Sequence, residues 1–498
     1  MKYHSIKNNE TCPLGAIPEL GYDAFFAQNT GLLAKLENHV VSYFGVPEGE
    51  AVRVYSCIAN DATAEIYLCS TRMELSKTYP SLSKHRLAFQ KFEREIHENY
   101  GVGYSGHPWL KPLRFPFNRT DKASQIANYP FFRIESEELH EVGVGPIHAG
   151  VIEPGHFRFI CNGEQIWHLE IQLGFQHRGV EALFLQKEKL LQRHTLAEGI
   201  AGDTVAGHTT AFVNLWESLA GFQPGEDLRF ARTLALELER LAVHTGGLSA
   251  MCTDVAYQLG SAVFGRLRTP LINFFQEWCG NRFAKGLIRA GYSNFPFTPE
   301  LGDRLRQILD AYEPDYLEMC RKTFTLPSVQ ARFERTGVVS EEDAWSFGAV
   351  GMAARTSCIA RDVRASHPHD GYLQLAHKPV VKHHGDVYSR AQIRRQEIRQ
   401  SLGYIRQLLG KIPAPSGNKT ALNAPAANAF TLSLVEGWRG EICHCAITGP
   451  GGKLQHYKVK DPSFHNWLAV AMSVRNNEIS DFPICNKSFD LSYCGHDL

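Results

Sequence analysis

Hydrophobic and polar residues alternate in several short stretches near the start of the chain. The segments "AVRVYSCIA" (51–59) and "AEIYLCST" (64–71) change character at every second residue, which predicts β-strands. A dense run of charges over 92–100 predicts an amphipathic helix whose charged side chains face solvent. Together these patterns indicate a small α+β domain, to which we assign residues 1–118.

A change in composition marks the end of this first unit. Residues 115–136 contain two prolines and little periodicity, so we place a linker at 119–138. Beyond it, "EPG" (153–155) and "NGE" (162–164) interrupt alternating runs and predict β-hairpins. The fold class that we expect is therefore α+β with two domains, the second spanning 139–498.

The second domain reads as mainly helical with small strand patches. Leu234, Leu238, Leu241 and Leu248 recur near helical spacing, with Glu237 and Arg240 off that stripe. Further patterns predict an amphipathic helix over 386–409 that stops at Gly410, a loop over 412–429, short strands over 430–460 and a last helix over 462–474.

Composition excludes some classes of function. The 498 residues contain 52 basic and 52 acidic side chains, so nothing indicates a nucleic-acid surface. No apolar run approaches the roughly 20 residues of a membrane-spanning helix, and the first residues lack the apolar core of a secretory signal. We therefore expect a cytoplasmic protein.

Twelve cysteines are spread along the chain without a single Cys-x-x-Cys motif, and we expect them to be reduced. Cys443 and Cys445 share one face of a predicted strand, where buried packing explains them. The tail "CNKSFDLSYCGHDL" (485–498) is rich in metal-binding residue types. The spacing of Cys485, Asp490, Cys494 and His496 matches no usual zinc pattern, so we expect no metal there and a tail held by packing and polar contacts.

Two groups of motifs resemble known families. The stretch "FEREIHENYGVGYSGHPWL" (92–110) resembles the signature of the small hydrophilic 30 kDa-type subunit of respiratory complex I. The segments "GPIHAGVIEPGHFRF", "GFQHRGVEALF", "ELERLAVHTGGL", "GMAARTSCIARDVRASHPHDGY" and "VEGWRGEI" follow in order. This set resembles the large subunit of [NiFe] hydrogenases of the formate-hydrogenlyase type, and the homologous 49 kDa-type quinone-site subunit of complex I.

In the hydrogenase family two Cys-x-x-Cys pairs hold nickel and iron. The early pair corresponds to "EGIAGDTVAGH" (198–208), where Ala201 and Thr204 stand at the ligand positions while Gly202 and His208 match. Neither Ala201 nor Thr204 supplies a thiolate.

The C-terminal pair corresponds to "DLSYCG" (490–495). Ser492 and Gly495 stand at the ligand positions, Cys494 lies one position away, and Asp490 keeps the family's aspartate. Because a nickel–iron pair needs several thiolates, the resemblance predicts that conventional hydrogenase chemistry is lost.

The quinone-site branch fits only in part. Its hairpin histidine is kept as His148, but its second histidine falls on Ile152 and its pocket tyrosine falls near Gly202 or Asp203. The chain therefore resembles hydrogenase-related complexes that keep the scaffold and lose the metal.

The resemblance also indicates which residues could carry chemistry. Glu181 matches a family glutamate that passes protons, although a helix-start glutamate favoured by the helix dipole explains it equally well. We take as catalytic candidates Glu181, Asp203, His208, Arg355 and Asp490. We take as pocket or quinone-side candidates His148, Thr204, Asp362, Arg364, Ser492 and Cys494.

Buried charges must be paired, so we expect Arg355 or Arg364 to pair with Asp490 or Asp203. A salt-bridged scaffold without chemistry is the alternative interpretation of this group.

The resemblance implies the large subunit of a membrane-associated oxidoreductase complex that couples electron transfer to ion translocation. The alternatives are a metal-free structural or proton-relay subunit, and a hydrogenase with unusual ligands. We expect no cofactor on this chain, because it lacks cysteine clusters and a dinucleotide-binding glycine motif. The implied partners are an iron–sulfur small subunit, membrane-arm subunits and quinone, with attachment to the inner side of the cell membrane through those subunits.

Overall fold

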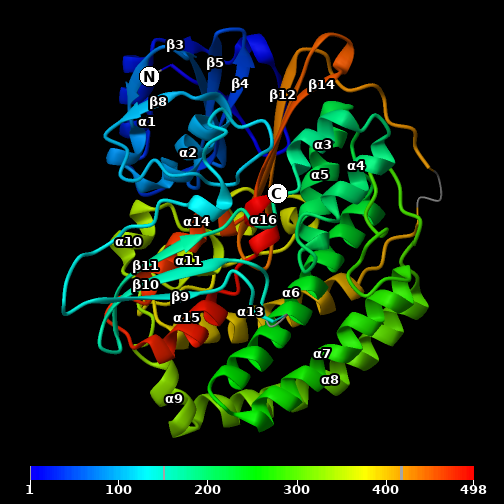
Figure 1. Cartoon of the computed structure of the whole chain (residues 1–498). Helices are drawn as coiled ribbons and strands as arrows, with labels where there is room; N and C mark the ends of the chain where they lie inside the picture. Colours follow the sequence, from blue (N-terminus) through cyan, green and yellow to red (C-terminus); the bar gives the residue numbers. More distant parts are fainter. Residues whose placement is uncertain (1, 150–151, 416–418) are drawn as a thin grey trace.

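A computed structural model describes residues 2–149, 152–415 and 419–498 of the chain (Figure 1). The N-terminal region is built on one sheet with the strand order β1-β6-β5-β4, in which β3 pairs with β6 in parallel. Both strands predicted from alternation are confirmed as β5 and β6, which pair over their whole length. The bounds are β1 (His4–Ile6), β3 (Glu19–Leu20), β4 (Asn38–Glu48), β5 (Ala51–Asn60) and β6 (Glu65–Glu74), with helices α1 (Tyr22–Leu32) and α2 (Gln90–Tyr100) and the parallel pair β7 (Thr78–Pro80) and β8 (Gly103–Ser105).

Helix α2 corrects one prediction from the charge pattern. Glu93, Arg94 and Glu95 do not face solvent but are buried. Glu93 accepts hydrogen bonds from the Ser81 hydroxyl and from the backbone N–H of Leu82. The charges are tolerated because each one finds internal partners, several of them from segments far along the chain.

A second sheet joins the two ends of the sequence. It has the order β14-β13-β12-β2, so strand β2 (Thr11–Pro13) from the N-terminal region pairs with β12 (Ala429–Glu436) from the C-terminal region. The remaining strands are β13 (Glu441–Thr448) and β14 (Leu454–Lys460), which confirm the strands predicted over 430–460. Cys443 and Cys445 are buried side by side on β13 with their sulfurs 3.6 Å apart, as predicted.

A third sheet confirms the predicted hairpins. Strands β9 (His140–Val144), β10 (His156–Asn162) and β11 (Gln165–Gln172) pair antiparallel in the order β11-β10-β9. Residues 150 and 151 within the first hairpin, and residues 416–418 within the predicted loop 412–429, lie outside the described residues. Over 115–136 the structure has one short turn of 3-10 helix, Ile126–Asn128, and no strand.

The C-terminal region is mainly helical, so the predicted fold class is confirmed. The helix predicted over 386–409 is α13 (Val387–Leu409), and Gly410 follows it at the C-cap. The predicted last helix is α14 (Ser463–Ser473), but it is not the last: α15 (Phe482–Phe489) and α16 (Tyr493–Asp497) follow. The other helices are α3 (Val180–Gln186), α4 (Leu190–Ala197), α5 (Val205–Leu219), α6 (Glu226–Asp254), α7 (Gln258–Cys279), α8 (Pro299–Thr325), α9 (Pro327–Phe333), α10 (Glu341–Ser346), α11 (Gly351–Arg355) and α12 (Val363–Ser366).

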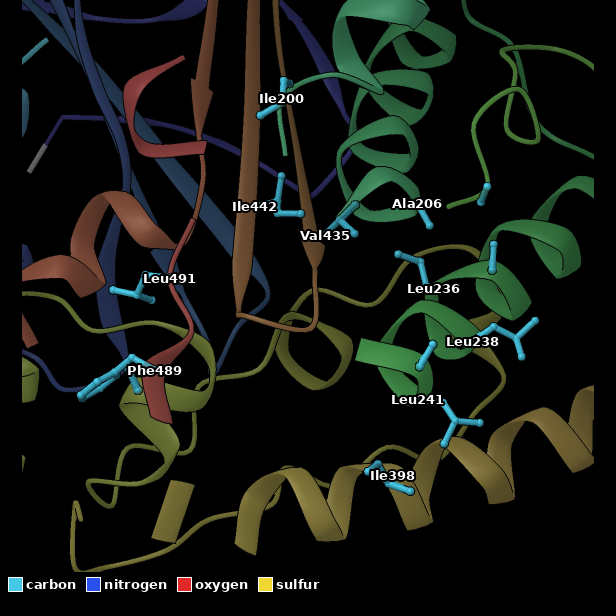
Figure 2. Close-up of a cluster of buried hydrophobic side chains, with 14 of the residues drawn as sticks. Ile200, Ala206, Leu236, Leu238, Leu241, Ile398, Val435, Ile442, Phe489 and Leu491 are labelled. Carbon is cyan, nitrogen blue, oxygen red and sulfur yellow. The ribbon is translucent and has the colours of Figure 1, made fainter. Parts of the chain in front are cut away.

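Helix α6 runs through the core of this region, and its leucine stripe is fully buried. Figure 2 shows Leu238 and Leu241 of α6 in the same cluster of buried hydrophobic side chains as Ile398 of α13. Burial of each such side chain contributes on the order of 1.5–3 kcal/mol. Within the described ranges, none of the helices combines the length and apolar character that a bilayer crossing requires.

Candidate functional site

Two segments far apart in the sequence meet beside the C-terminal tail. The turn before α5 carries Asp203 and Thr204, and the segment between α15 and α16 carries Asp490. The Arg178 guanidinium connects them, since it donates to the carbonyl of Ile200 at 3.0 Å and to that of Cys494 at 3.3 Å. These are the two segments in which the resemblance implies metal-ligand positions.

Arg439 lies between the same two segments and bridges them. Its terminal nitrogens donate to both carboxylate oxygens of Asp203, at 2.6 and 2.7 Å, and to the Thr204 hydroxyl at 3.1 Å. Its Nε donates to the backbone carbonyl of Asp490. Arg439 thus joins the two segments through one bidentate arginine–carboxylate pair, a geometry that guanidinium groups favour.

The tight turn between β12 and β13 holds Arg439 in place. Gly437 and Gly440 exchange backbone hydrogen bonds of 2.9 and 3.1 Å, and Gly440 has a φ of 141°. A Cβ on Gly440 would lie 2.7 Å from the Cα of Gly351, so only glycine allows this turn to approach the start of α11. The Trp438 indole stacks 4.0 Å from the guanidinium carbon of Arg439 and donates to the carbonyl of Asp203.

Charge in this site is balanced. Burial opposes ionisation of Arg439, but the Asp203 carboxylate outweighs burial and raises the pKa of Arg439 above its usual value. Burial likewise opposes ionisation of Asp490, but Lys487, Arg439 and Arg394 lower the pKa of Asp490. The site therefore holds two opposite-charge pairs, Arg439 with the Asp203 carboxylate and Lys487 with the Asp490 carboxylate.

A chain of buried polar side chains begins at His208 on α5. His208 lies 2.9 Å from Asp461 and 3.1 Å from His444 on β13, and His444 lies 2.8 Å from the Tyr457 hydroxyl on β14. Burial and the neighbouring His208 lower the pKa of His444 well below its usual value, so its imidazole is neutral. With His444 neutral, hydrogen bonds can be donated in sequence from the Tyr457 hydroxyl through His444 and His208 to Asp461.

The acid end of this chain reaches the tail. A Cβ on Gly495 would lie 2.7 Å from the Asp461 carboxyl carbon and 2.9 Å from the Ser492 hydroxyl. The Ser492 hydroxyl caps α16 by accepting from the backbone N–H of Gly495, and the Cys494 sulfur lies 3.4 Å away. Burial raises the pKa of the Cys494 thiol.

The tail is buried and held by packing and polar contacts, as predicted. Asp497 accepts from the backbone N–H groups of Gly174 and Gln176, both at 2.9 Å. Among the described residues, no three or more histidine, cysteine, aspartate or glutamate side chains form a group that could hold a metal ion.

Arg355 and Arg364 belong to a separate, enclosed ion cluster, which corrects the pairing predicted for them. Arg355 contacts Glu397 at 2.6 Å and Glu436 at 2.7 Å, and Arg364 contacts Asp362 at 2.7 Å. Neither pairs with Asp203 or Asp490, which bind Arg439 and Lys487 instead. Glu397 on helix α13 and Glu436 on strand β12 supply the carboxylates that contact Arg355, and Glu397 also contacts Arg364.

Glu181 lies in the first turn of α3, beside a second charged group. Its carboxylate lies 3.0 Å from the Lys458 amine and accepts from the backbone N–H of Val459 at 2.9 Å. Lys458 also contacts Glu95 at 2.6 Å, so a buried lysine joins α2 to α3. Both roles considered for Glu181, helix-start acid and proton carrier, agree with this placement.

His148 is not brought to Arg439 by any hydrogen bond in the described part of the chain. Its Nε2 lies 2.8 Å from the carbonyl of Gly155 across the hairpin. Ile152 is partly buried in the same turn. His148 and the Arg439 group are therefore two separate features of the structure.

Sequence reasoning missed several residues of the site. Arg439, Asp461, His444 and Tyr457 were not among the candidates, nor were Glu397 and Glu436. Arg439 stands within the motif "VEGWRGEI", so that motif was the signal that could have found it. His444 and Tyr457 had no such signal, because they read as strand residues.

Comparisons with known proteins agree with the motifs. Residues 258–429 match the family model of the respiratory-chain NADH dehydrogenase 49 kDa subunit. Hydrogenase-4 component G of Escherichia coli (strain K12) is 26% identical over 436 residues, covering 84% of this chain and 75% of the relative. Formate hydrogenlyase subunit 5 of the same organism is 27% identical over 434 residues, covering 83% and 76%.

A third relative reflects the arrangement of two units in one chain. The C/D component of NADH-quinone oxidoreductase from Phocaeicola vulgatus is 28% identical over 443 residues, which cover 81% of this chain and 83% of the relative. The resemblance stated from the motifs is therefore confirmed: the chain is similar to the 49 kDa subunit of respiratory-chain NADH dehydrogenase, to the C/D subunit of NADH-quinone oxidoreductase, and to subunits of hydrogenase-4 and formate hydrogenlyase.

Proposed function

We propose that the chain is the large subunit of a membrane-associated, complex I-like or hydrogenase-related oxidoreductase complex. In this proposal the complex couples electron transfer to ion translocation. The relatives support it by their names, since they are subunits of hydrogenase and NADH-quinone oxidoreductase complexes. The single observation that carries the proposal is the Arg439 bridge between the two segments in which the relatives' metal ligands are expected.

The donor set at these segments does not fit a nickel–iron pair held by four thiolates. Thr204 and Ser492 offer hydroxyl groups that are already hydrogen-bonded, and the Cys494 sulfur lies 3.4 Å from the Ser492 hydroxyl. Hard hydroxyl oxygens are poor ligands for soft metals. In the proposed function an ionised Asp203–Arg439 pair takes the space of a metal centre, and no step passes through nickel or iron.

The proposed partners are an iron–sulfur small subunit and membrane-arm subunits, which would hold the chain at the inner side of the cell membrane. An affinity-tagged chain purified from its native membranes should bring down a subunit with iron–sulfur signals in electron paramagnetic resonance. If the tagged chain purifies from the soluble fraction without such a subunit, the proposal is wrong.

The activity test uses the assembled complex. Arg439→Met should abolish electron transfer to quinone analogues while the subunits still assemble, because Asp203 loses its counter-ion. Arg266→Met is the matched control, since Arg266 pairs with Asp315 at the surface. Equal activity of both variants would contradict a role for the Arg439 bridge.

A second candidate function is a metal-free structural or proton-relay subunit. The contacts of Glu181 with Lys458, and the chain from Tyr457 to Asp461, favour it, because both offer hydrogen-bonded routes for protons. Glu181→Gln keeps the acceptor for Val459 but removes the acid. Unchanged ion transport by the assembled Glu181→Gln complex would remove Glu181 from any relay.

A third candidate, a hydrogenase with unusual ligands, is tested by metal analysis of the purified complex. Nickel at about one equivalent per chain would support it, and nickel far below one equivalent would exclude it.

A further inference from the structure

A cavity of about 120 Å³ lies where the N-terminal region meets the tail. Helix α2, strand β11, helix α14 and helix α16 each contribute to its wall, and Figure 1 shows these elements converging near the C-terminus. Much of the lining is apolar, from Trp109, Leu113, Leu169, Trp467 and Ala471. The cavity is separate from the Arg439 bridge and has no part in the proposed redox function.

Two cations on α2 line this cavity without a carboxylate partner. Lys91 is 8% exposed, and among the described residues no acidic side chain lies within ion-pair distance of it. Arg94 donates to the backbone carbonyls of Lys111 and Pro112 and has no carboxylate partner in the described ranges either. The carboxylate in this wall, Glu170, is already paired with Lys111. Buried cations without counter-ions are costly, so Lys91 and Arg94 in the same wall indicate that an anion completes the site.

Electrostatics around Lys91 point in the same direction. Burial lowers the pKa of Lys91 well below its usual value, and Arg94 and Arg114 lower it further. Asp497 acts in the opposite sense, but its carboxylate already accepts from the backbone N–H groups of Gly174 and Gln176. An anion in the cavity would restore the charge that Lys91 loses on burial.

The polar atoms of the wall are also incompletely satisfied. Within the described residues, the side-chain oxygen of Gln90, Nε2 of His168 and Nε2 of His496 are buried and have no hydrogen-bond partner. Gln90 and His496 are 4% and 1% exposed. Buried polar atoms are normally paired, and three unpaired ones around one cavity indicate a missing occupant.

We propose that this cavity binds a small organic monoanion, a carboxylate on an aromatic or short aliphatic body. The carboxylate would pair with Lys91, and the body would contact Trp109 and Trp467. At about 120 Å³ this cavity is somewhat smaller than an apolar cavity of about 150 Å³ that accommodates benzene, so a single ring is the largest body that it can take. Bound there, the ligand fastens α2 to the tail and stabilises the junction of the two regions.

The first test uses the full chain and three probes in calorimetric titration and thermal unfolding. Benzoate should bind and raise the unfolding temperature. Benzyl alcohol has the same ring without the charge, and inorganic phosphate has charge without an apolar body; both should bind at least about tenfold more weakly. Benzoate binding no tighter than either comparator would overturn the proposal, as would no benzoate binding at millimolar concentration.

Two variants test separately the role of the Lys91 amine and the role of the cavity volume in benzoate binding. Lys91→Met keeps the length of the side chain and should weaken benzoate binding about tenfold or more without loss of stability, because the variant leaves no carboxylate partner of Lys91 unpaired. Ala471→Leu fills the cavity from α14 and should weaken benzoate binding through a different element. Lys77→Met, at an exposed site, is the control.

If both cavity variants bind benzoate as the wild type does, benzoate binds elsewhere and the proposal fails. If Lys91→Met does not fold, Ala471→Leu and the comparison of probes on the wild-type chain still decide the question. None of these measurements depends on electron transfer, so failure of the redox proposal leaves this one testable.

Discussion

Two buried ionic groups in this chain are built from the same residue types but differ in closure. In the enclosed cluster around Arg355, the side chains of Arg355, Asp362 and Glu397 are all 0% exposed. In the Arg439 bridge, the Asp203 side chain is 38% exposed although the arginine itself is 4% exposed. The enclosed cluster is sealed inside the fold, whereas the bridge meets solvent at its acid.

Saturation separates the two groups further. In the enclosed cluster, three arginines contact four carboxyl groups: Arg240, Arg355 and Arg364 face Glu237, Asp362, Glu397 and Glu436. Two of these carboxyl groups also contact a histidine, Glu397 with His244 and Asp362 with His377. Burial and the neighbouring Asp362 raise the pKa of Glu436 to about 7, so the fourth carboxyl can carry a proton and balance the charge. A saturated, sealed cluster is suited to holding the fold, while a half-open pair beside the tail can interact with other molecules.

The largest expected effect tests the structural role of the enclosed cluster. Arg355→Met should lower the free energy of unfolding by about 3–5 kcal/mol, because it leaves Glu436 buried without a guanidinium partner and removes the shortest of the arginine contacts of Glu397. Denaturant unfolding followed by circular dichroism measures the loss. Arg304→Met, which breaks an exposed pair with Glu277, is the control and should cost less than about 1 kcal/mol. Equal losses would show that closure does not distinguish the two kinds of pair.

The next effect tests the bridge. Arg439→Met should cost about 2 kcal/mol, less than Arg355→Met, because Asp203 can turn to solvent when its partner is removed. The same unfolding experiment ranks the two variants. A loss for Arg439→Met as large as that for Arg355→Met would mean that the bridge is as structural as the enclosed cluster, and the comparison would fail.

The third effect concerns the chain from Tyr457 to Asp461. Tyr457→Phe removes the hydroxyl that contacts Nδ1 of His444 and leaves that nitrogen unpaired in the core. The expected loss of stability is about 1 kcal/mol. Tyr292→Phe, at a partly exposed loop position, is the matched control. An unchanged free energy of unfolding would mean that the hydrogen bond between the Tyr457 hydroxyl and His444 contributes nothing to stability.

Periodicity predicted local structure well but could not predict which charges pair. Strands β5 and β6 and helix α13 follow from alternation and helical spacing, which depend on neighbouring residues alone. The charged run of α2 predicted side chains exposed to solvent, whereas Glu95 is buried. Its partners are Arg114 and Lys458, and Lys458 is 363 residues away in the sequence. A pattern of charges within eleven residues contains no information on partners at that distance.

The site shows the same division. The family resemblance pointed to Asp203, Thr204, His208 and Asp490, and the structure brings three of these to Arg439 and its neighbours. The pairing of Arg355 could not be derived, because Glu397 reads as an ordinary member of an amphipathic helix and the motif that contains Glu436 gives no information on its partner. Only the packing of α11 against α13 and β12 shows that they converge.

The smallest expected effect is a pH dependence that belongs to the bridge. Lys487, Arg439 and Arg394 overcome burial and hold the pKa of Asp490 below its usual value. Stability from this ionised carboxylate is therefore present above the unfolded-state pKa of about 3.9 and is lost as the pH falls through the lowered folded-state pKa. Asp490→Asn should leave a shallower fall in stability below about pH 4 than the wild type has, with the two curves parallel above that pH.

Urea unfolding at a series of pH values measures this slope, and Asp315→Asn provides the control because solvent screens the exposed pair of Asp315 with Arg266. The Asp490 side chain is 20% exposed and its contact with Lys487 is 3.0 Å, so screening is partial and the effect is smaller than that of removing Arg439. If Asp490→Asn and wild type lose stability with the same slope, Asp490 is not held ionised by its neighbours. The half-open site would then depend on the Asp203–Arg439 pair alone, and the comparison with the enclosed cluster would reduce to one ion pair.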